Sequence, residues 1–163
     1  THPKQRHKRL FVQQAQSVFQ RPVSTLLMLS GLIPFVAYAV LEVSDLWDGT
    51  EFIYQTREIA LAYALMILSF MAGVHWGQHL DRSDKWQRWL PFASNAVALL
   101  GWISFVLLSN QVTMLIFALL FLVILAIDWL LSIEQIIDRA YFRLRSIITL
   151  IVCLSLLASA WVY

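Results

Sequence analysis

Two histidines of this 163-residue chain, His75 and His79, are spaced so that both side chains could act on one ligand. They are four residues apart, so on a helix they lie one turn apart on the same side, next to Trp76. Two imidazoles in this arrangement could bind zinc, copper or nickel, or one of them could ligate a haem. Because no cysteine, glutamate or third histidine lies nearby in sequence to complete a coordination shell, we predict no metal site. The alternative to this prediction is a metal site formed by His75 and His79.

Asp128 is a single charged residue inside a long apolar segment. Depth counted from the ends of the expected helices places His75, Asn95 and Asp128 in one layer of the inner leaflet. Arg143 and Arg145 approach the same boundary from the inner side. An aspartate that faces lipid costs about 2.5–3.5 kcal/mol, so we expect these side chains to turn towards each other, with an Asp–His or Asp–Arg pair.

This polar layer has two interpretations. The first, which we favour, is that the polar side chains fix the register of an otherwise apolar helical bundle. The second is a site that binds a quinone headgroup or handles protons, because a histidine–carboxylate pair can exchange a proton near neutral pH. We expect no catalytic residue, since the chain contains no Walker loop and no GxSxG, HExxH or EF-hand pattern. No cofactor is predicted, and a quinone or haem is the alternative.

The elements that position these residues follow from composition and hydropathy. The chain is 60% hydrophobic and 13% charged, whereas soluble domains carry about a quarter charged residues. This balance excludes intrinsic disorder and a nucleic-acid-binding module. Five apolar segments are long enough to cross the roughly 30 Å hydrocarbon layer as helices. They cover residues 23–41, 59–80, 89–108, 112–133 and 146–163. We therefore predict an all-α, polytopic integral membrane protein with a single five-helix membrane domain over residues 23–163.

Basic residues lie almost entirely on one side of these segments. Eleven of the twelve Lys and Arg precede the first segment or lie in the second and fourth connections, which leaves only Arg57 on the other side. The positive-inside rule then predicts an N-terminus inside and a C-terminus outside. Residues 1–22 combine a basic tail with helical spacing of Phe11, Ala15 and Phe19, which predicts an amphipathic helix lying on the inner leaflet.

Small residues and one proline predict how two of the helices pack. Ser69, Gly73 and Gly77 recur every four residues, so one helix face permits close backbone approach, and we expect a packing seam rather than a ligand site. Gly31 and Pro34 predict a kink in the first helix, because Pro34 lacks a backbone donor and clashes with the preceding turn.

Residues after the fourth segment keep a helical apolar period. Ile133, Ile136, Ile137, Ala140 and Leu144 share this spacing. It predicts that the fourth helix continues into an amphipathic elbow before the chain turns back.

Three sequence blocks resemble a known family. SGLIPF (residues 30–35), ILSFMAGVHWG (67–77) and AYFRLR (140–145) resemble domain-of-unknown-function family 3429, with matching order and spacing over roughly residues 25–160. That family is similar to the eukaryotic transmembrane protein sixty-nine family. The resemblance implies several spans and a bacterial inner membrane or a mitochondrial inner membrane, and it implies no established reaction.

The predicted function follows from the small amount of chain outside the spans and the absence of catalytic motifs. We expect a non-enzymatic accessory or assembly subunit of a larger membrane complex, of respiratory or photosynthetic type. Its partners would be the lipid bilayer and other integral membrane subunits, not nucleic acid. The alternative is a small binding or transport protein that uses His75, Asn95 and Asp128 for a quinone, haem or metal. No cleavable signal peptide is expected, because the first apolar run is too long and lacks a cleavage pattern, and Thr1 is interpreted as initiator removal.

Overall fold

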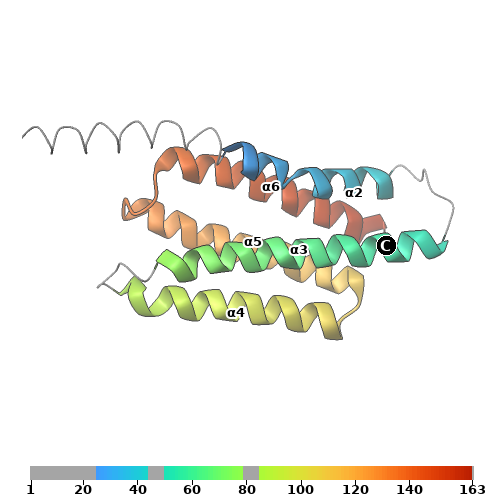
Figure 1. Cartoon of the computed structure of the whole chain (residues 1–163), viewed down its shortest axis with the longest axis horizontal. Helices are drawn as coiled ribbons and strands as arrows, with labels where there is room; N and C mark the ends of the chain where they lie inside the picture. The colour runs from blue at the N-terminus through green and yellow to red at the C-terminus, as the bar shows by residue number, and fades with distance from the viewer. Residues whose placement is uncertain (1–24, 44–49, 79–84, 163) are drawn as a thin grey trace, which may run out of the picture.

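Long antiparallel helices form the part of the chain that the computed structural model describes, residues 25–43, 50–78 and 85–162. Successive helices run in opposite directions, so the first described helical residues and the end of α6 lie at opposite ends of the bundle (Figure 1). The predicted all-α class is confirmed for the described residues. The helices are α2 (Ile33–Val43), α3 (Thr50–Gln78), α4 (Trp86–Leu107), α5 (Asn110–Ile133) and α6 (Arg139–Val162).

Five segments are long and apolar enough to cross a membrane, which confirms the predicted number of spans for the described part of the chain. Most of their boundaries lie within a few residues of the predicted ones. The exception is the last span, which begins at Arg139 rather than at residue 146. Its first two turns contain arginines, and Arg145 is nevertheless buried because a carboxylate neutralises it.

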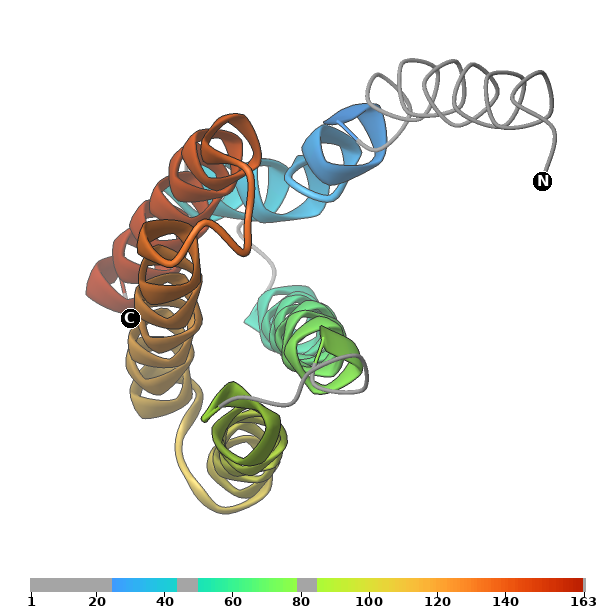
Figure 2. The same cartoon turned by 90° about the vertical axis from the view of Figure 1, so that its left-hand side faces the viewer.

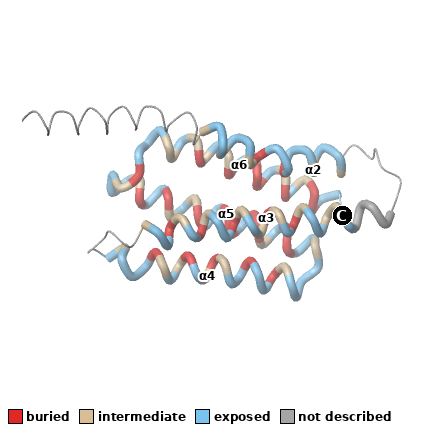
Figure 3. The backbone as a smooth tube through the Cα atoms, in the orientation of Figure 1, coloured by how far each residue is buried: buried red, intermediate tan, exposed pale blue. Residues whose placement is uncertain are grey.

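Large apolar side chains cover the outside of the bundle. Leu99 and Trp102 on α4 and Leu119 on α5 are each more than half exposed. Buried residues form stripes that face the interior, and exposed residues lie on the outer sides of the same helices (Figure 3). A surface of this kind would aggregate in water, whereas it is expected where lipid is the solvent.

The core of the bundle is centred on α5. This helix packs along α6 on one side and also contacts α3 and α4, while α3 packs closely against α4. Viewed from its end, the bundle is a row of α6, α5 and α4 with α2 and α3 beside it (Figure 2). Phe117, Phe121 and Ile124 of α5 form the main core with Leu68 of α3 and Leu156 of α6.

The first span is broken just before α2. Residues 25–30 are helical, and Gly31 and Leu32 then form a turn. In that turn the Leu32 amide bonds to the carbonyl of Leu29, three residues back, at 3.0 Å. The Tyr63 hydroxyl of α3 donates to the Gly31 carbonyl at 3.0 Å. The break therefore lies where Gly31 and Pro34 predict a kink, and a hydrogen bond from α3 stabilises it.

The connection between α5 and α6 is a tight turn, so the predicted amphipathic elbow is wrong. Gln135 adopts a positive φ of 57° two residues after the end of α5. Its amide bonds to the Ser132 carbonyl at 3.2 Å, and the Ile136 amide bonds to the Leu131 carbonyl at 2.9 Å. These two bonds are the Schellman pattern that ends a helix. Ile136 and Ile137 then pack back against Leu131, which explains their apolar period without a continued helix.

The small-residue stripe of α3 faces away from the bundle. Ser69, Gly73 and Gly77 are exposed, and a Cβ atom built on either glycine would meet nothing within 4 Å. The prediction that this stripe packs against another helix of the same chain is therefore wrong for the described residues. The close approach between α3 and α4 uses Gly101 instead, where a Cβ would lie 2.9 Å from the Leu68 side chain.

Candidate functional site

Three ionisable side chains from three helices meet inside the bundle. His75 comes from α3, Asp128 from α5 and Arg145 from α6, and their exposed fractions are 1%, 1% and 4%. They lie towards the end of the bundle at which α3 and α5 finish and α6 begins (Figure 1). We call this the basic end, because Lys85, Arg88, Arg139 and Arg143 also lie at the matching helix ends.

Asp128 occupies the centre of the cluster. Its Oδ1 atom lies 2.7 Å from His75 Nε2, and its Oδ2 atom lies 2.6 Å from Arg145 Nε. Arg145 Nη1 also donates to the Tyr141 hydroxyl at 2.9 Å. The predicted pairing of Asp128 with His75 or with an arginine is confirmed, since both pairs form.

The charges of the cluster balance without the histidine. The carboxylate of Asp128 and the guanidinium of Arg145 cancel, so the site is electrically neutral when His75 is neutral. Unpaired charge in the apolar interior costs several kcal/mol, whereas a contacting ion pair offsets much of that cost. The geometry therefore explains how an aspartate and an arginine are both accommodated among membrane-spanning helices.

The polar residues of the cluster continue the apolar stripes of their helices. Buried positions on each helix recur every three or four residues, which is the helical period of one face. His75, Asp128 and Arg145 fall on these faces, so the helices point them at one another. The stripes are Leu61, Ala64, Leu68, Ala72 and His75 on α3; Phe117, Phe121, Ile124, Asp128 and Leu131 on α5; and Arg145, Thr149, Val152 and Leu156 on α6.

Asn95 does not belong to the cluster, so the expectation that its side chain turns towards His75 and Asp128 is wrong. It is exposed on α4, and its neighbour Ser94 is buried instead. The Ser94 hydroxyl donates to the Ala72 carbonyl of α3. One residue turns a helix by about 100°, so Ser94 and Asn95 cannot both face the interior. The buried stripe through Leu90 and Val97 identifies Ser94 as the inward residue.

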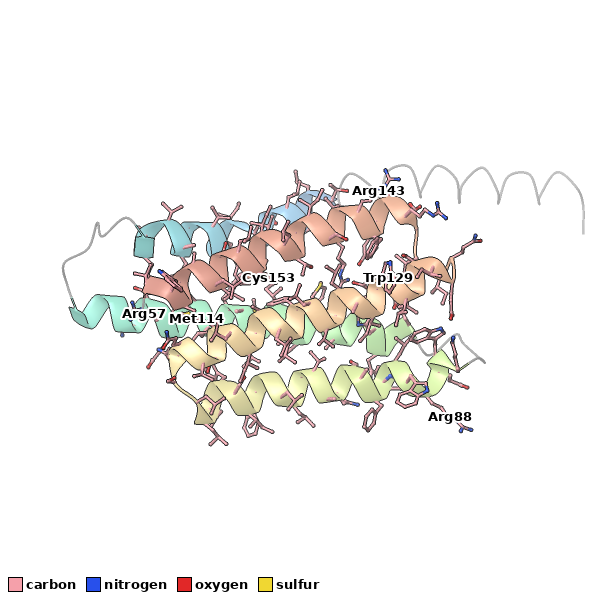
Figure 4. The ribbon with its side chains drawn as sticks, turned by 180° about the vertical axis from the view of Figure 1, so that it is seen from behind. Arg57, Arg88, Met114, Trp129, Arg143 and Cys153 are labelled. Atoms are coloured by element: carbon pink, nitrogen blue, oxygen red, sulfur yellow. The ribbon has the colours of Figure 1, made fainter. Side chains whose placement is uncertain are left out.

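Arg143 and Arg145 are separated in the same way. Arg143 is exposed and projects from the basic end of the bundle (Figure 4), whereas Arg145 turns inward. Two residues along a helix place side chains on nearly opposite sides. Of the two arginines, Arg145 is therefore the one that contacts Asp128.

The metal alternative rests partly on His79, which lies outside the described residues. Among the residues that are described, no group of three His, Cys, Asp or Glu side chains is arranged to hold a metal ion. The alternative of a metal site at His75 and His79 is therefore not tested. The predicted basic tail and N-terminal interfacial helix at residues 1–22 also lie outside the described residues and stay predictions.

A second ion pair, which sequence reasoning missed, lies at the opposite end of the bundle. Glu42 of α2 contacts Arg57 of α3, and their side chains are 5% and 13% exposed. Tyr38 lies beside the pair. Arg57 is at the far end from Arg88 and Arg143 (Figure 4). A signal was available in the sequence, because Arg57 is the lone basic residue on a side rich in Asp and Glu.

The fold and the buried cluster together define a class: a polytopic helical membrane protein with an internal ion-paired site. The chain belongs to the family described as protein of unknown function (DUF3429), whose model matches residues 20–161. This confirms the family resemblance drawn from the three sequence blocks, while the similarity to the transmembrane protein sixty-nine family stays a prediction. Neither the curated proteins nor the solved structures contain a match to this chain.

Proposed function

We propose that this protein is a non-enzymatic accessory or assembly subunit that packs against another integral membrane protein through the outer face of α3. The observation that carries the proposal is the orientation of Ser69, Gly73 and Gly77. They face outward, and no atom from elsewhere in the described chain comes within 4 Å of a Cβ position at the two glycines.

Helices associate in membranes mainly through van der Waals packing, and small residues allow two backbones to approach closely. The outward stripe of α3 offers such an approach. Phe70 and Trp76 lie on the same exposed side, with 64% and 45% of their surfaces exposed. A partner helix that contacts the glycines would therefore also bury aromatic surface.

The described connections add little mass outside the membrane. Leu108 and Ser109 join α4 to α5, and residues 134–138 join α5 to α6. These lengths suit a subunit whose interactions occur within the bilayer. The basic end carries Arg88 and Arg143. By the positive-inside rule, these residues support an orientation in which the basic end lies on the inner side of a bacterial or mitochondrial inner membrane.

Affinity purification from native membranes in mild detergent, followed by mass spectrometry, tests the docking face. We expect the wild-type protein to retain a membrane partner and the double variant Gly73→Leu/Gly77→Leu to lose it. Ala126→Leu is the matched control, because Ala126 is an exposed small residue on α5 near the depth of Gly73. Subunits of respiratory or photosynthetic complexes among the retained proteins would identify the type of complex.

Two results would contradict the docking proposal. One is that the wild-type protein leaves native membranes as a stable lone monomer. The other is that the double leucine variant retains the same partners as the wild type. The alternative of a quinone-, haem- or metal-binding protein stays a prediction, which an absorption spectrum, metal analysis and quinone extraction of the purified protein would test.

A further inference from the structure

We propose that the cluster of His75, Asp128 and Arg145 is a reversible proton-binding site, in which the proton is taken up at His75 Nδ1. This inference goes beyond the docking function and depends on different residues. It makes the proton the ligand of the cluster, and three helices supply the groups that hold it.

The first step of the argument fixes the tautomer of His75. Arg145 Nε forms an ion pair with Asp128 Oδ2 at 2.6 Å, and such a pair contains the ionised carboxylate. An ionised carboxylate only accepts hydrogen bonds, so the 2.7 Å contact between Asp128 Oδ1 and His75 Nε2 requires the hydrogen on Nε2. In neutral His75, Nδ1 is then the bare nitrogen, with a free lone pair.

The second step concerns the surroundings of that bare nitrogen. His75 Nδ1 is buried and has no hydrogen-bond partner among the residues that the structure describes. The lone pair of Nδ1 is therefore the open position for a proton from solvent. Uptake of that proton forms an imidazolium, which Asp128 already contacts through Nε2.

The third step counts the charges that face the site. Asp128 comes from α5, and Arg145 with Tyr141 comes from α6. The buried residues of α4 at this end, Leu90 and Ser94, are uncharged. Protonation therefore changes the cluster from net zero to one positive charge. Asp128 is then shared by two cations from two different helices.

This sharing gives proton uptake a structural consequence. Before uptake, the electrostatic attraction of Asp128 is directed at Arg145, which ties α5 to α6. After uptake, His75 competes for the same carboxylate and ties α5 to α3 as well. The proton thus redistributes the electrostatic contacts among three helices without any other ligand.

Nitrogen NMR of the full chain in lipid bilayers, with ¹⁵N-labelled histidine, tests the proposal directly. The resonances of His75 are those that disappear in the variant His75→Gln. We expect neutral His75 to carry its hydrogen on Nε2, and Nδ1 to shift from the bare to the protonated range as the sample is acidified. A hydrogen on Nδ1 at neutral pH, or an Nδ1 signal that never shifts, would overturn the proposal.

Two variants separate a proton site from a purely structural contact. In Asp128→Asn we expect the preference for hydrogen on Nε2 to be lost, because an amide, unlike a carboxylate, can also donate a hydrogen bond to the ring nitrogen. Arg143→Met, which removes an exposed arginine, should leave the His75 signals unchanged. If Asp128→Asn does not fold, the tautomer and shift of the wild type still decide the matter. The variant Gly73→Leu/Gly77→Leu should give the same His75 nitrogen signals as the wild type. A loss of partners in that variant therefore tests the docking proposal independently of the proton site.

Discussion

Asp128 shows at the scale of one residue how a carboxylate can exist inside a membrane bundle. Both of its oxygens are engaged, one by His75 at 2.7 Å and one by Arg145 at 2.6 Å. Each partner comes from a different helix, so the cost of burying the charge is offset only when the tertiary structure is complete. The same contacts stabilise the fold and hold His75 in one orientation. A structural role and a proton-binding role are therefore compatible here.

The first prediction concerns the free energy of unfolding. Asp128→Asn leaves Arg145 buried with its charge uncompensated, and we expect a loss of about 3–5 kcal/mol. The double variant Asp128→Asn/Arg145→Met removes both charges and should recover most of that loss. Denaturant unfolding of these two variants and of Arg145→Met in detergent micelles completes the double-mutant cycle. Arg143→Met is the control for arginine removal and should change little. A double variant as unstable as Asp128→Asn would show that the two side chains do not act as a pair.

Gln135 shows at the scale of one element how the chain reverses between α5 and α6. The Schellman bonds require a left-handed backbone at this position, and glutamine adopts φ 57° there. Left-handed geometry costs a residue with a Cβ roughly 1–2 kcal/mol, whereas glycine adopts it readily. The turn is therefore held by the packing of Ile136 and Ile137 rather than by local preference.

The second prediction follows from that conformation. Gln135→Gly should raise the free energy of unfolding by about 0.5–1 kcal/mol, since the gain in the folded turn exceeds the entropy that glycine adds to the unfolded chain. Thermal unfolding in the same detergent measures it. Gln135→Ala is the control and should not stabilise, because alanine also has a Cβ. Equal stabilisation by alanine would rule out the backbone explanation.

The third prediction compares two glycines on neighbouring helices. Gly101 of α4 lies against Leu68 and Leu65, where a Cβ would be at 2.9 and 3.2 Å. Gly101→Leu should force α3 and α4 apart and destabilise the protein by about 3 kcal/mol or prevent folding. Gly73→Leu points into open space and should leave the melting temperature of the purified protein nearly unchanged. Comparable losses in both variants would contradict the assignment of the internal seam to Gly101.

At the scale of the whole molecule, the distribution of charge distinguishes the two ends of the bundle. Arg88 and Arg143 lie at the basic end, and Arg57 lies at the other (Figure 4). Arg57 is paired with Glu42, which reduces its contribution as a free positive charge. The positive-inside rule then favours the basic end on the inner side of the membrane.

The fourth prediction tests this orientation with the two described turns. Ser109 and Asp138 are exposed and lie in turns at opposite ends of the bundle (Figure 1). In a background of Cys153→Ser, the variant Ser109→Cys should react with a membrane-impermeant maleimide applied from outside. Asp138→Cys should react only after the membrane is permeabilised. The reverse pattern would invert the proposed orientation, and labelling of both from one side would contradict the five-span arrangement.

The sequence by itself determined that five segments are long and apolar enough to cross a membrane, and in that case they must be helices, because only helices satisfy their own backbone groups in lipid. It also determined that Asp128 must find a partner, since an aspartate facing lipid is costly. The tertiary structure alone decided which residues those partners are. Helical phase turned Arg145 and Ser94 inward and Arg143 and Asn95 outward, and the turn at Gln135 ended α5 where the apolar period suggested that it continued. Phase and turn geometry depend on packing between helices, which a pattern along one segment does not contain.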